Sequence, residues 1–306
     1  MFALSTGTSF VDLDFQGMRG VIATGVVTDP AGVTLVDPGP TSCLDTLRRA
    51  LGDAGIRLED VRHVLLTHIH LDHAGVVGTL VQQNPAIEVH VHERGARHMI
   101  DPSRLIDSAT RLYGTMMGPL WGAMLPVPAE RVKALTGGER ITIGARTFDV
   151  AYTPGHASHH VSYLQRDIGL AWVGDTAGVR VGTSRLALPP TPPPDVDLDA
   201  WDVSLAKIRA WEASRLFLTH FGPVESVPGH LDDFAVRLRE TAGMVRRSLD
   251  RASDESGQFA AFSEEFGRYI RRSMSERDAS AYELAAPNFY NWQGLVRYWR
   301  KRAADR

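Results

Sequence analysis

Three histidines and one aspartate fall within six consecutive positions, in the segment from His68 to His73, which reads H-I-H-L-D-H. This segment directly follows residues 61–66, an apolar run with the character of a short buried strand. Imidazole nitrogen and carboxylate oxygen are ligands that zinc accepts, and so tight a cluster can serve two adjacent ions. The segment therefore predicts a metal site at the end of a strand.

Three more potential ligands follow strand-like runs farther along the chain: His156, Asp175 and His220. Any one of them alone would be explained as well by a capping or core role. Because each stands at the end of an expected strand, each is well placed to converge on the first cluster. The set therefore favours a metal site with ligands for two ions.

The elements that must position these residues alternate between strands and helices. This order indicates two sheets sandwiched between helices. The expected strands cover 9–15, 20–27, 33–36, 61–66, 87–91, 140–152, 161–164, 170–173 and 215–218, and the expected helices cover 42–51, 74–81 and 199–211.

Two segments stand apart from this alternation. Residues 105–125 are apolar and rich in methionine, which suits either helix packing or one wall of a substrate pocket. The pocket interpretation nominates Tyr113, Met116, Met117 and Trp121. The prolines between 189 and 194 exclude a helix or a central strand and predict an extended loop.

The last quarter of the chain, from about residue 230, has helical spacing of its apolar residues. We therefore expect a catalytic domain over 1–229 and a C-terminal helical region over 230–306. All proposed ligands precede this region, so it should shape the substrate pocket or a contact between two copies of the chain. Trp292, Tyr298 and Trp299 are large aromatic residues that favour such buried contacts.

Composition limits the class of protein. The chain has 306 residues, 43% hydrophobic and 23% charged, with a formal net charge of −3. This charge favours neither a nucleic-acid nor a membrane partner. The one cysteine, Cys43, excludes an internal disulfide framework. With no secretory signal or transmembrane run evident, we expect a cytoplasmic enzyme acting on a small molecule, with a homodimer left open.

The order of these motifs resembles that of the metallo-β-lactamase superfamily, whose signature is H-x-H-x-D-H followed by separated His, Asp and His ligands. The similarity extends over residues 9–225 and implies an αββα sandwich, an α+β fold. It implies one ion on His68, His70 and His156. It implies a second ion on Asp72, His73 and His220, with Asp175 bridging both ions. Asp37 matches the family's aspartate that braces the histidine loop.

Within the superfamily, residues 153–163 are similar to the glyoxalase II-like motif T-P-G-H-T-x-G-H-x-x-Y. His159 replaces the usual glycine of that motif. Asp175 is followed by T-A-G-V-R, whereas the glyoxalase branch has L-F-G-G-C at this point. The glutathione-binding features of that branch are not recognisable in the C-terminal part. His160 is expected beside the ligands rather than among them.

The resemblance implies hydrolysis by a metal-bridging hydroxide, with Asp72 and Asp175 as the catalytic carboxylates. Zinc is the expected metal, although manganese or iron suits the same ligands. We expect a thioester, lactone or carboxylic ester as substrate. Phosphodiester or RNA hydrolysis, and a metal site with a purely structural role, are the alternatives.

β-Lactam hydrolysis and redox chemistry are less favoured by the motif. Many β-lactamases of the superfamily place a cysteine among the ligands of the second metal. Here Asp72 lies within the motif and Cys43 lies far from it. The flavin-linked diiron branch usually has an acidic residue where this chain has His70. The first feature disfavours β-lactam hydrolysis, and the second disfavours redox chemistry.

Overall fold

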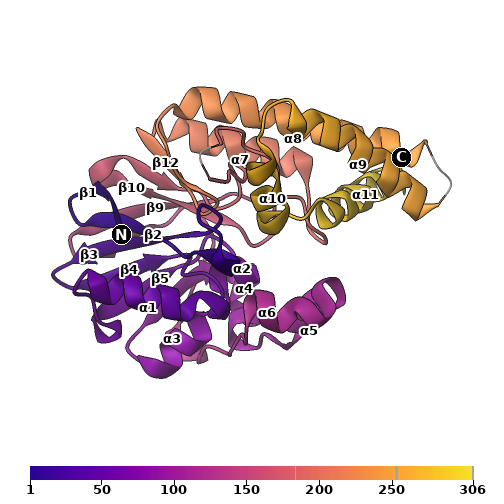
Figure 1. Cartoon of the computed structure of the whole chain (residues 1–306). Coiled ribbons are helices and arrows are strands. Elements are labelled where there is room, and N and C mark those ends of the chain that lie inside the picture. Colours follow the sequence, from indigo (N-terminus) through magenta and orange to yellow (C-terminus); the bar gives the residue numbers. More distant parts are fainter. Residues whose placement is uncertain (183, 252–253, 305–306) are drawn as a thin grey trace.

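Two β-sheets pack face to face in this computed structural model, and helices cover the outer side of each (Figure 1). The structure describes residues 1–182, 184–251 and 254–304. Helices α1 and α3 lie against the first sheet, and α7 and α8 lie against the second. The predicted αββα sandwich with a C-terminal helical region is confirmed.

The first sheet has seven strands in chain order, and its direction changes in the middle. Neighbours from β1 to β4 pair antiparallel, whereas β4 to β7 run parallel. The carboxyl ends of the parallel strands therefore share one edge of the sheet, where ligands usually bind. The strands are β1 (Phe2–Ser5), β2 (Thr8–Asp12), β3 (Ala23–Asp29), β4 (Gly32–Val36), β5 (Val61–Leu65), β6 (Glu88–His92) and β7 (Val132–Leu135).

The second sheet has six strands in the order β13-β12-β11-β10-β9-β8. All neighbours pair antiparallel except β11 and β12, which run parallel. The strands are β8 (Arg140–Ile143), β9 (Arg146–Tyr152), β10 (Val161–Gln165), β11 (Leu170–Trp172), β12 (Arg215–Leu218) and β13 (Gly222–Val224).

Helices connect the strands and form the C-terminal region. They are α1 (Leu44–Asp53), α2 (Leu71–Ala74), α3 (Val77–Gln83), α4 (Glu93–Ile100), α5 (Ser103–Tyr113), α6 (Met117–Trp121), α7 (Leu198–Ala210), α8 (Val227–Leu249), α9 (Glu255–Arg271), α10 (Glu276–Ala285) and α11 (Asn288–Ala304). None of the helices that the structure describes is both long and apolar enough to cross a membrane.

The sandwich has separate apolar layers between and outside its sheets. Large side chains such as Phe148, Trp172 and Phe217 fill the space between the sheets. Leu205 of α7 and Phe234 of α8 pack on the outer side of the second sheet. These layers hold both sheets rigidly, so that the loops at one edge can present polar side chains without contributing much to the core.

The C-terminal helices continue directly from the sandwich. Helix α8 begins at Val227, so the predicted boundary between 229 and 230 lies in its first turn. Within the helical region expected from about residue 230, a break near Pro287 separates α10 from α11. In Figure 1, α10 and α11 lie on the same side of the sandwich as α5 and α6. Whether residues 230–306 form a separate domain stays a prediction.

Candidate metal centre

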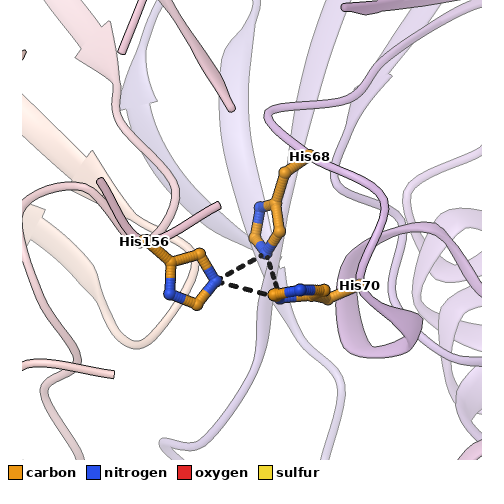
Figure 2. A group of neighbouring side chains, drawn as sticks. All are labelled: His68, His70 and His156. Atoms are coloured by element: carbon orange, nitrogen blue, oxygen red, sulfur yellow. Dashed lines mark hydrogen bonds between the residues drawn. The ribbon is translucent and has the colours of Figure 1, made fainter. Parts of the chain in front are cut away.

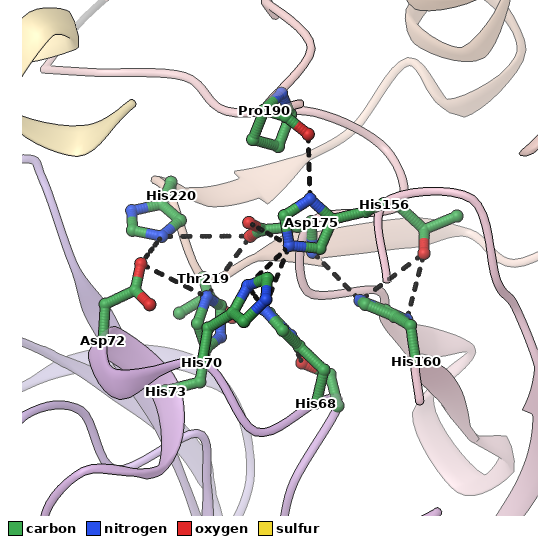
Figure 3. A network of polar contacts seen from close by, with 12 residues as sticks. His68, His70, Asp72, His73, His156, His160, Asp175, Pro190, Thr219 and His220 are labelled. Carbon is green, nitrogen blue, oxygen red and sulfur yellow. Dashed lines mark hydrogen bonds and ion pairs between the residues drawn. The ribbon is translucent and has the colours of Figure 1, made fainter. Parts of the chain in front are cut away.

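Polar side chains converge at the edge of the sandwich from the ends of four strands (Figure 3). The segment from His68 to His73 follows β5, and its last residues form the short helix α2. His156 lies in the connection from β9 to β10. Asp175 follows β11, and His220 lies between β12 and β13. All seven predicted ligands thus come together from segments far apart in the sequence.

Asp37 links two of these segments, the one after β5 and the one after β12. Its carboxylate is buried and accepts hydrogen bonds from the Thr67 amide at 2.8 Å and the Thr67 hydroxyl at 2.7 Å. It also accepts from the Thr219 hydroxyl at 2.7 Å and lies 2.8 Å from His73 Nδ1. Asp37 has a φ of 47°, which aspartate tolerates better than most residues. Asp37 therefore makes the contacts to the histidine loop that the resemblance implied.

His68, His70 and His156 direct one ring nitrogen each toward a common point (Figure 2). His68 Nε2 lies 3.0 Å from His70 Nδ1 and 3.2 Å from His156 Nε2, and the last two atoms are 2.9 Å apart. Ligands of one tetrahedral ion with metal–nitrogen bonds of about 2.0–2.1 Å are separated by roughly 3.3 Å. The triangle has close to that size.

The outer hydrogen bonds of two rings leave bare nitrogens in the triangle. His156 Nδ1 donates to the Pro190 carbonyl at 2.8 Å. Thr67 gives its hydroxyl proton to Asp37, so its oxygen accepts from His68 Nδ1 at 3.1 Å. The Nε2 atoms of His68 and His156 then carry lone pairs that face each other, an unfavourable contact that a bound cation relieves.

A second group contains Asp72, His73 and His220. His220 Nδ1 donates to the Val21 carbonyl at 2.7 Å, which leaves Nε2 free to face Asp72 Oδ2 at 3.2 Å. His73 Nδ1 donates to Asp37, and its buried Nε2 has no hydrogen-bond partner. An orphaned buried nitrogen is costly, and its position beside two other donors suits a metal ligand.

Asp175 lies between the two groups with one oxygen toward each. Its Oδ2 is 3.4 Å from His156 Nε2, and its Oδ1 is 3.4 Å from His73 Nε2 and 3.8 Å from His220 Nε2. Oδ1 is buried without a hydrogen-bond partner. This placement is the one that a carboxylate bridging two ions requires.

The backbone around Asp175 is held closely. His160 Nε2 accepts from the Asp175 amide at 3.2 Å, and its Nδ1 lies 3.0 Å from both Thr153 Oγ1 and Thr176 Oγ1. Gly174 has a φ of 48°, and a Cβ there would meet Thr67 Oγ1 at 2.4 Å. His160 therefore contacts the backbone of Asp175 and is absent from the ligand triangle.

The protonation of the two groups differs. Burial lowers the pKa of His70 to about 4 and also lowers the pKa values of His68 and His156. Burial acts against the charged form of His73 too, but the carboxylates of Asp72, Asp175 and Asp37 raise its pKa. The first group is thus neutral and ready to bind a cation, whereas the second group must release protons to do so.

The carboxylates of the centre are ionised. Burial acts to raise the pKa of Asp72, but the nearby His73 and His220 lower it to about 2. The pKa of Asp175 is lowered well below its ordinary value against the same burial effect, by His73, His156 and His220. Anionic oxygen and neutral imidazole together form a donor set that fits divalent zinc, manganese or iron.

An apolar pocket of about 110 Å³ opens on this centre. His70, Asp72, His156 and Asp175 form its polar end. We call this space the apolar pocket. Its wall includes Leu105, Ala109, Leu112, Tyr113, Trp121, Pro190, Ala286, Pro287 and Tyr290. The wall combines α5, α6, the proline loop and the region between α10 and α11.

The methionines nominated from sequence lie elsewhere. Tyr113 and Trp121 line the apolar pocket, whereas Met116 and Met117 do not. Met116 is exposed, and Met117 packs against the hydrophobic core. Tyr290 was not nominated, yet its ring lies 5.1 Å from that of Tyr113, and its hydroxyl donates to the Leu112 carbonyl at 2.6 Å. No motif in the sequence marks this contact.

A further set of metal-binding side chains lies on the same sheet. The ligand atoms of His63, in the middle of β5, and of Glu88 and His90, in the first half of β6, lie close together. His63 Nδ1 is 3.3 Å from His90 Nε2, and Lys133 forms an ion pair with Glu88. This group lies away from the carboxyl edge that carries the ligands, and it was not expected from the sequence.

Comparison with known proteins agrees with this geometry. The family model described as the Metallo-beta-lactamase superfamily matches residues 17–220. Metallo-beta-lactamase fold-containing protein ST1585 of Sulfurisphaera tokodaii is 29% identical over 153 residues, which are 49% of this chain and 56% of that protein. The chain therefore matches little more than half the length of this relative.

Two other proteins match over most of their length. Probable metallo-hydrolase YqjP of Bacillus subtilis is 22% identical over 88% of this chain and 90% of its own. The crystal structure of metallo-beta-lactamase family protein TTHA1429 of Thermus thermophilus has a TM-score of 0.70 at 19% identity. It covers 99% of this chain and 96% of that one. The expectation of a metallo-hydrolase is confirmed at the level of the family, because the chain belongs to the metallo-β-lactamase superfamily.

Proposed function

We propose that this protein is a dinuclear metal-dependent hydrolase that cleaves a thioester, lactone or carboxylic ester with a small apolar acyl group. One observation carries the proposal: four residues of the ligand cluster, His70, Asp72, His156 and Asp175, line the apolar pocket. A substrate held there by its acyl group would have its carbonyl carbon at the metal centre. Proximity of this kind accounts for much of the rate gain in enzymes.

The two groups would hold two divalent ions, with Asp175 shared between them. Bound ions supply a nucleophile from water near neutral pH and a Lewis acid for the carbonyl oxygen of the substrate. Zinc is the proposed metal, and manganese or iron fits the same nitrogen and oxygen donors. The chain's own contribution is to fix the donor atoms, which the outer hydrogen bonds of His68, His73, His156 and His220 do.

Asp72 is the residue best placed to orient the attacking water. Its side chain is 17% exposed, and it lines the apolar pocket, so it reaches the space where the substrate binds. With its pKa lowered to about 2 by His73 and His220, against the effect of burial, it is ionised at neutral pH and would serve as a hydrogen-bond acceptor for the attacking water rather than as a strong base. His73 Nε2 and His220 Nε2 lie 3.7 and 3.2 Å from its Oδ2 oxygen.

The shape of the apolar pocket favours an acyl group over a polynucleotide. Its volume of about 110 Å³ suits a short aliphatic or aromatic group. Tyr113, Trp121 and Tyr290 enclose it with ring-to-ring distances of 5.1 Å. An RNA substrate would need a basic groove that follows its backbone, whereas this chain has a net charge of −3.

A substrate panel tests the proposal. The metal-loaded protein is assayed with a butyryl thioester, a γ-lactone, a p-nitrophenyl ester, bis-p-nitrophenyl phosphate and a β-lactam. We expect turnover of at least one carboxylic substrate at about 1 s⁻¹ or more, since typical enzymes turn over at 1–10³ s⁻¹. Turnover of the phosphodiester or the β-lactam alone would contradict the proposal.

A further inference from the structure

A second cavity, of about 670 Å³, adjoins the metal centre and shares His70 with the apolar pocket. It is lined by three arginines, Arg94, Arg97 and Arg104, and by the buried His159. We call it the arginine cavity. Its size is that of sites that hold most of a drug-sized ligand. The inference drawn from it rests on the proposed function, because it concerns the rest of the same substrate.

Two helices hold the arginines at this cavity. Arg94 and Arg97 are three residues apart on α4, a spacing that places them on one helix face, and Arg104 lies in the first turn of α5. Helix α4 approaches the metal-binding loop closely at Gly95. A Cβ there would meet Ile69 Cγ2 at 2.8 Å, so no larger residue fits without displacement. The arginine face is therefore fixed beside His70.

The three guanidinium groups are not engaged in ion pairs. In the described part of the chain, no carboxylate lies within 4.0 Å of their nitrogens. Arg94 lies over the Tyr152 ring at 5.6 Å, and Arg97 Nε donates to His98 Nε2 at 3.2 Å. All three are exposed, so the donors that are not used in these contacts can bind an anion.

The other polar groups of the arginine cavity leave an excess of positive charge. Glu93 and Asp195 also line it, against three arginines. Asp195 already accepts a hydrogen bond from the Ser158 hydroxyl at 2.5 Å. His98 is partly buried, and burial together with the charges of Arg97 and Arg104 lowers its pKa. One net positive charge, carried by flexible donors, remains for a ligand.

His159 provides a second, independent sign of a ligand. Its side chain lines the cavity, is 9% exposed, and has a buried Nδ1 without a hydrogen-bond partner. The ring centroid lies 5.4 Å from that of His70. An unpaired buried nitrogen is costly unless something bound satisfies it. The His159 ring therefore lines the cavity beside His70 and carries a nitrogen that no group of the described protein satisfies.

We propose that the arginine cavity binds the anionic leaving group of the substrate, a phosphate- or carboxylate-bearing alcohol or thiol. The acyl group would enter the apolar pocket, and the scissile bond would lie near His70, which both cavities share. Guanidinium groups form paired hydrogen bonds with both phosphate and carboxylate, so the three arginines can bind either anion. The substrate is thus an amphipathic ester or thioester.

Binding of three uncleavable thioethers tests this site on the metal-loaded protein by calorimetry. S-butyl-coenzyme A carries phosphates, S-butylglutathione carries carboxylates, and S-butyl-N-acetylcysteamine is neutral. We expect at least one charged analogue to bind about tenfold or more tightly than the neutral one, since charged hydrogen bonds contribute strongly. The charged analogue that binds more tightly identifies the anion.

The double variant Arg94→Gln/Arg97→Gln should lower the binding affinity for that charged analogue about tenfold or more and leave the affinity for the neutral analogue unchanged. Arg111→Gln is the matched control, because Arg111 is an exposed arginine on α5 that lines neither cavity. Equal binding of charged and neutral analogues, or charged binding unaffected by the double variant, would overturn the inference.

Hydrolysis of the three matching butyryl thioesters separates this inference from the proposed function. If the binding pattern holds and no carboxylic substrate is cleaved, the anion site stands and the hydrolase assignment fails. If all three thioesters are cleaved with similar kcat/KM values, and the double variant does not change those values, the hydrolase assignment stands and the anion site is wrong.

Discussion

The metal centre and the wall of the apolar pocket face the same space but are built by opposite means. The proposed ligands of the centre lie in segments that follow strands and are buried or nearly so, and four of the histidines are held from behind by a specific acceptor such as Asp37 or the Pro190 carbonyl. The wall comes from helices and loops, and Tyr113 and Tyr290, two of its aromatic residues, are only partly buried. The centre is fixed by hydrogen bonds, whereas the wall is fixed by packing.

This difference indicates how the two regions divide the work. A donor displaced by a fraction of an ångström loses its metal, so the centre requires the brace beneath it. A wall made of packed side chains can change shape without disturbing the donors. We therefore expect substitutions in the centre to remove activity on every substrate and substitutions in the wall to change only which substrate is preferred.

The largest expected effect is that of His68→Ala. It removes one corner of the ligand triangle and with it several kcal/mol of Lewis-acid stabilisation, so kcat/KM should fall by ~10³-fold or more on every substrate. His63→Ala is the matched control, because His63 belongs to the separate group with Glu88 and His90. Comparable losses of activity in both variants would mean that His68 has no particular role in catalysis.

Asp37→Asn should have the next largest effect. The amide keeps the shape, but its nitrogen cannot accept the hydrogen bonds that Thr67, His73 and Thr219 direct to one carboxylate oxygen. Metal affinity, measured by competition with a chelator, should fall ~10- to 100-fold. The exposed Asp107 on α5 provides the control, Asp107→Asn. An unchanged metal affinity in Asp37→Asn would show that the hydrogen bonds to Asp37 do not support metal binding.

Metal binding should strengthen as pH rises from 6 to 8. Burial opposes the charged form of His73 and His220, but the nearby carboxylates raise the pKa values of both rings, so in the ion-free protein they keep their protons to a higher pH than free histidine does. An incoming cation must displace those protons, and each one released contributes up to about tenfold in affinity per pH unit. Proton release on adding zinc to a weakly buffered protein measures this directly. Affinity independent of pH would show that both rings are already neutral.

The wall should give the smallest effects, and they should depend on the substrate. Tyr290→Ala removes an aromatic side of the apolar pocket and should raise KM for a butyryl substrate ~10-fold while metal content stays the same. Met116→Ala, on an exposed side chain outside the pocket, should leave KM within about twofold. A loss of metal in Tyr290→Ala would mean that the wall and the centre are not separable.

The sequence predicts the centre far better than the wall, for a physical reason. Four of the ligands lie within one short segment after a strand, and the other three follow strands of their own, so local patterns suffice. Tyr290 and Leu112 are 178 residues apart, and nothing local connects them. Helix α4 was also missed, because its sequence, ERGARHMI, contains a glycine and few apolar residues, yet its arginines line the second cavity.

Metal counting in paired variants tests the central claim most directly. The reconstituted wild-type protein should hold two divalent ions per chain by elemental analysis. His70→Ala removes a donor of the first group and His220→Ala a donor of the second, so each variant should retain about one ion. Two ions in both variants, or less than one ion in the wild-type protein after reconstitution, would contradict the account of a dinuclear centre bridged by Asp175.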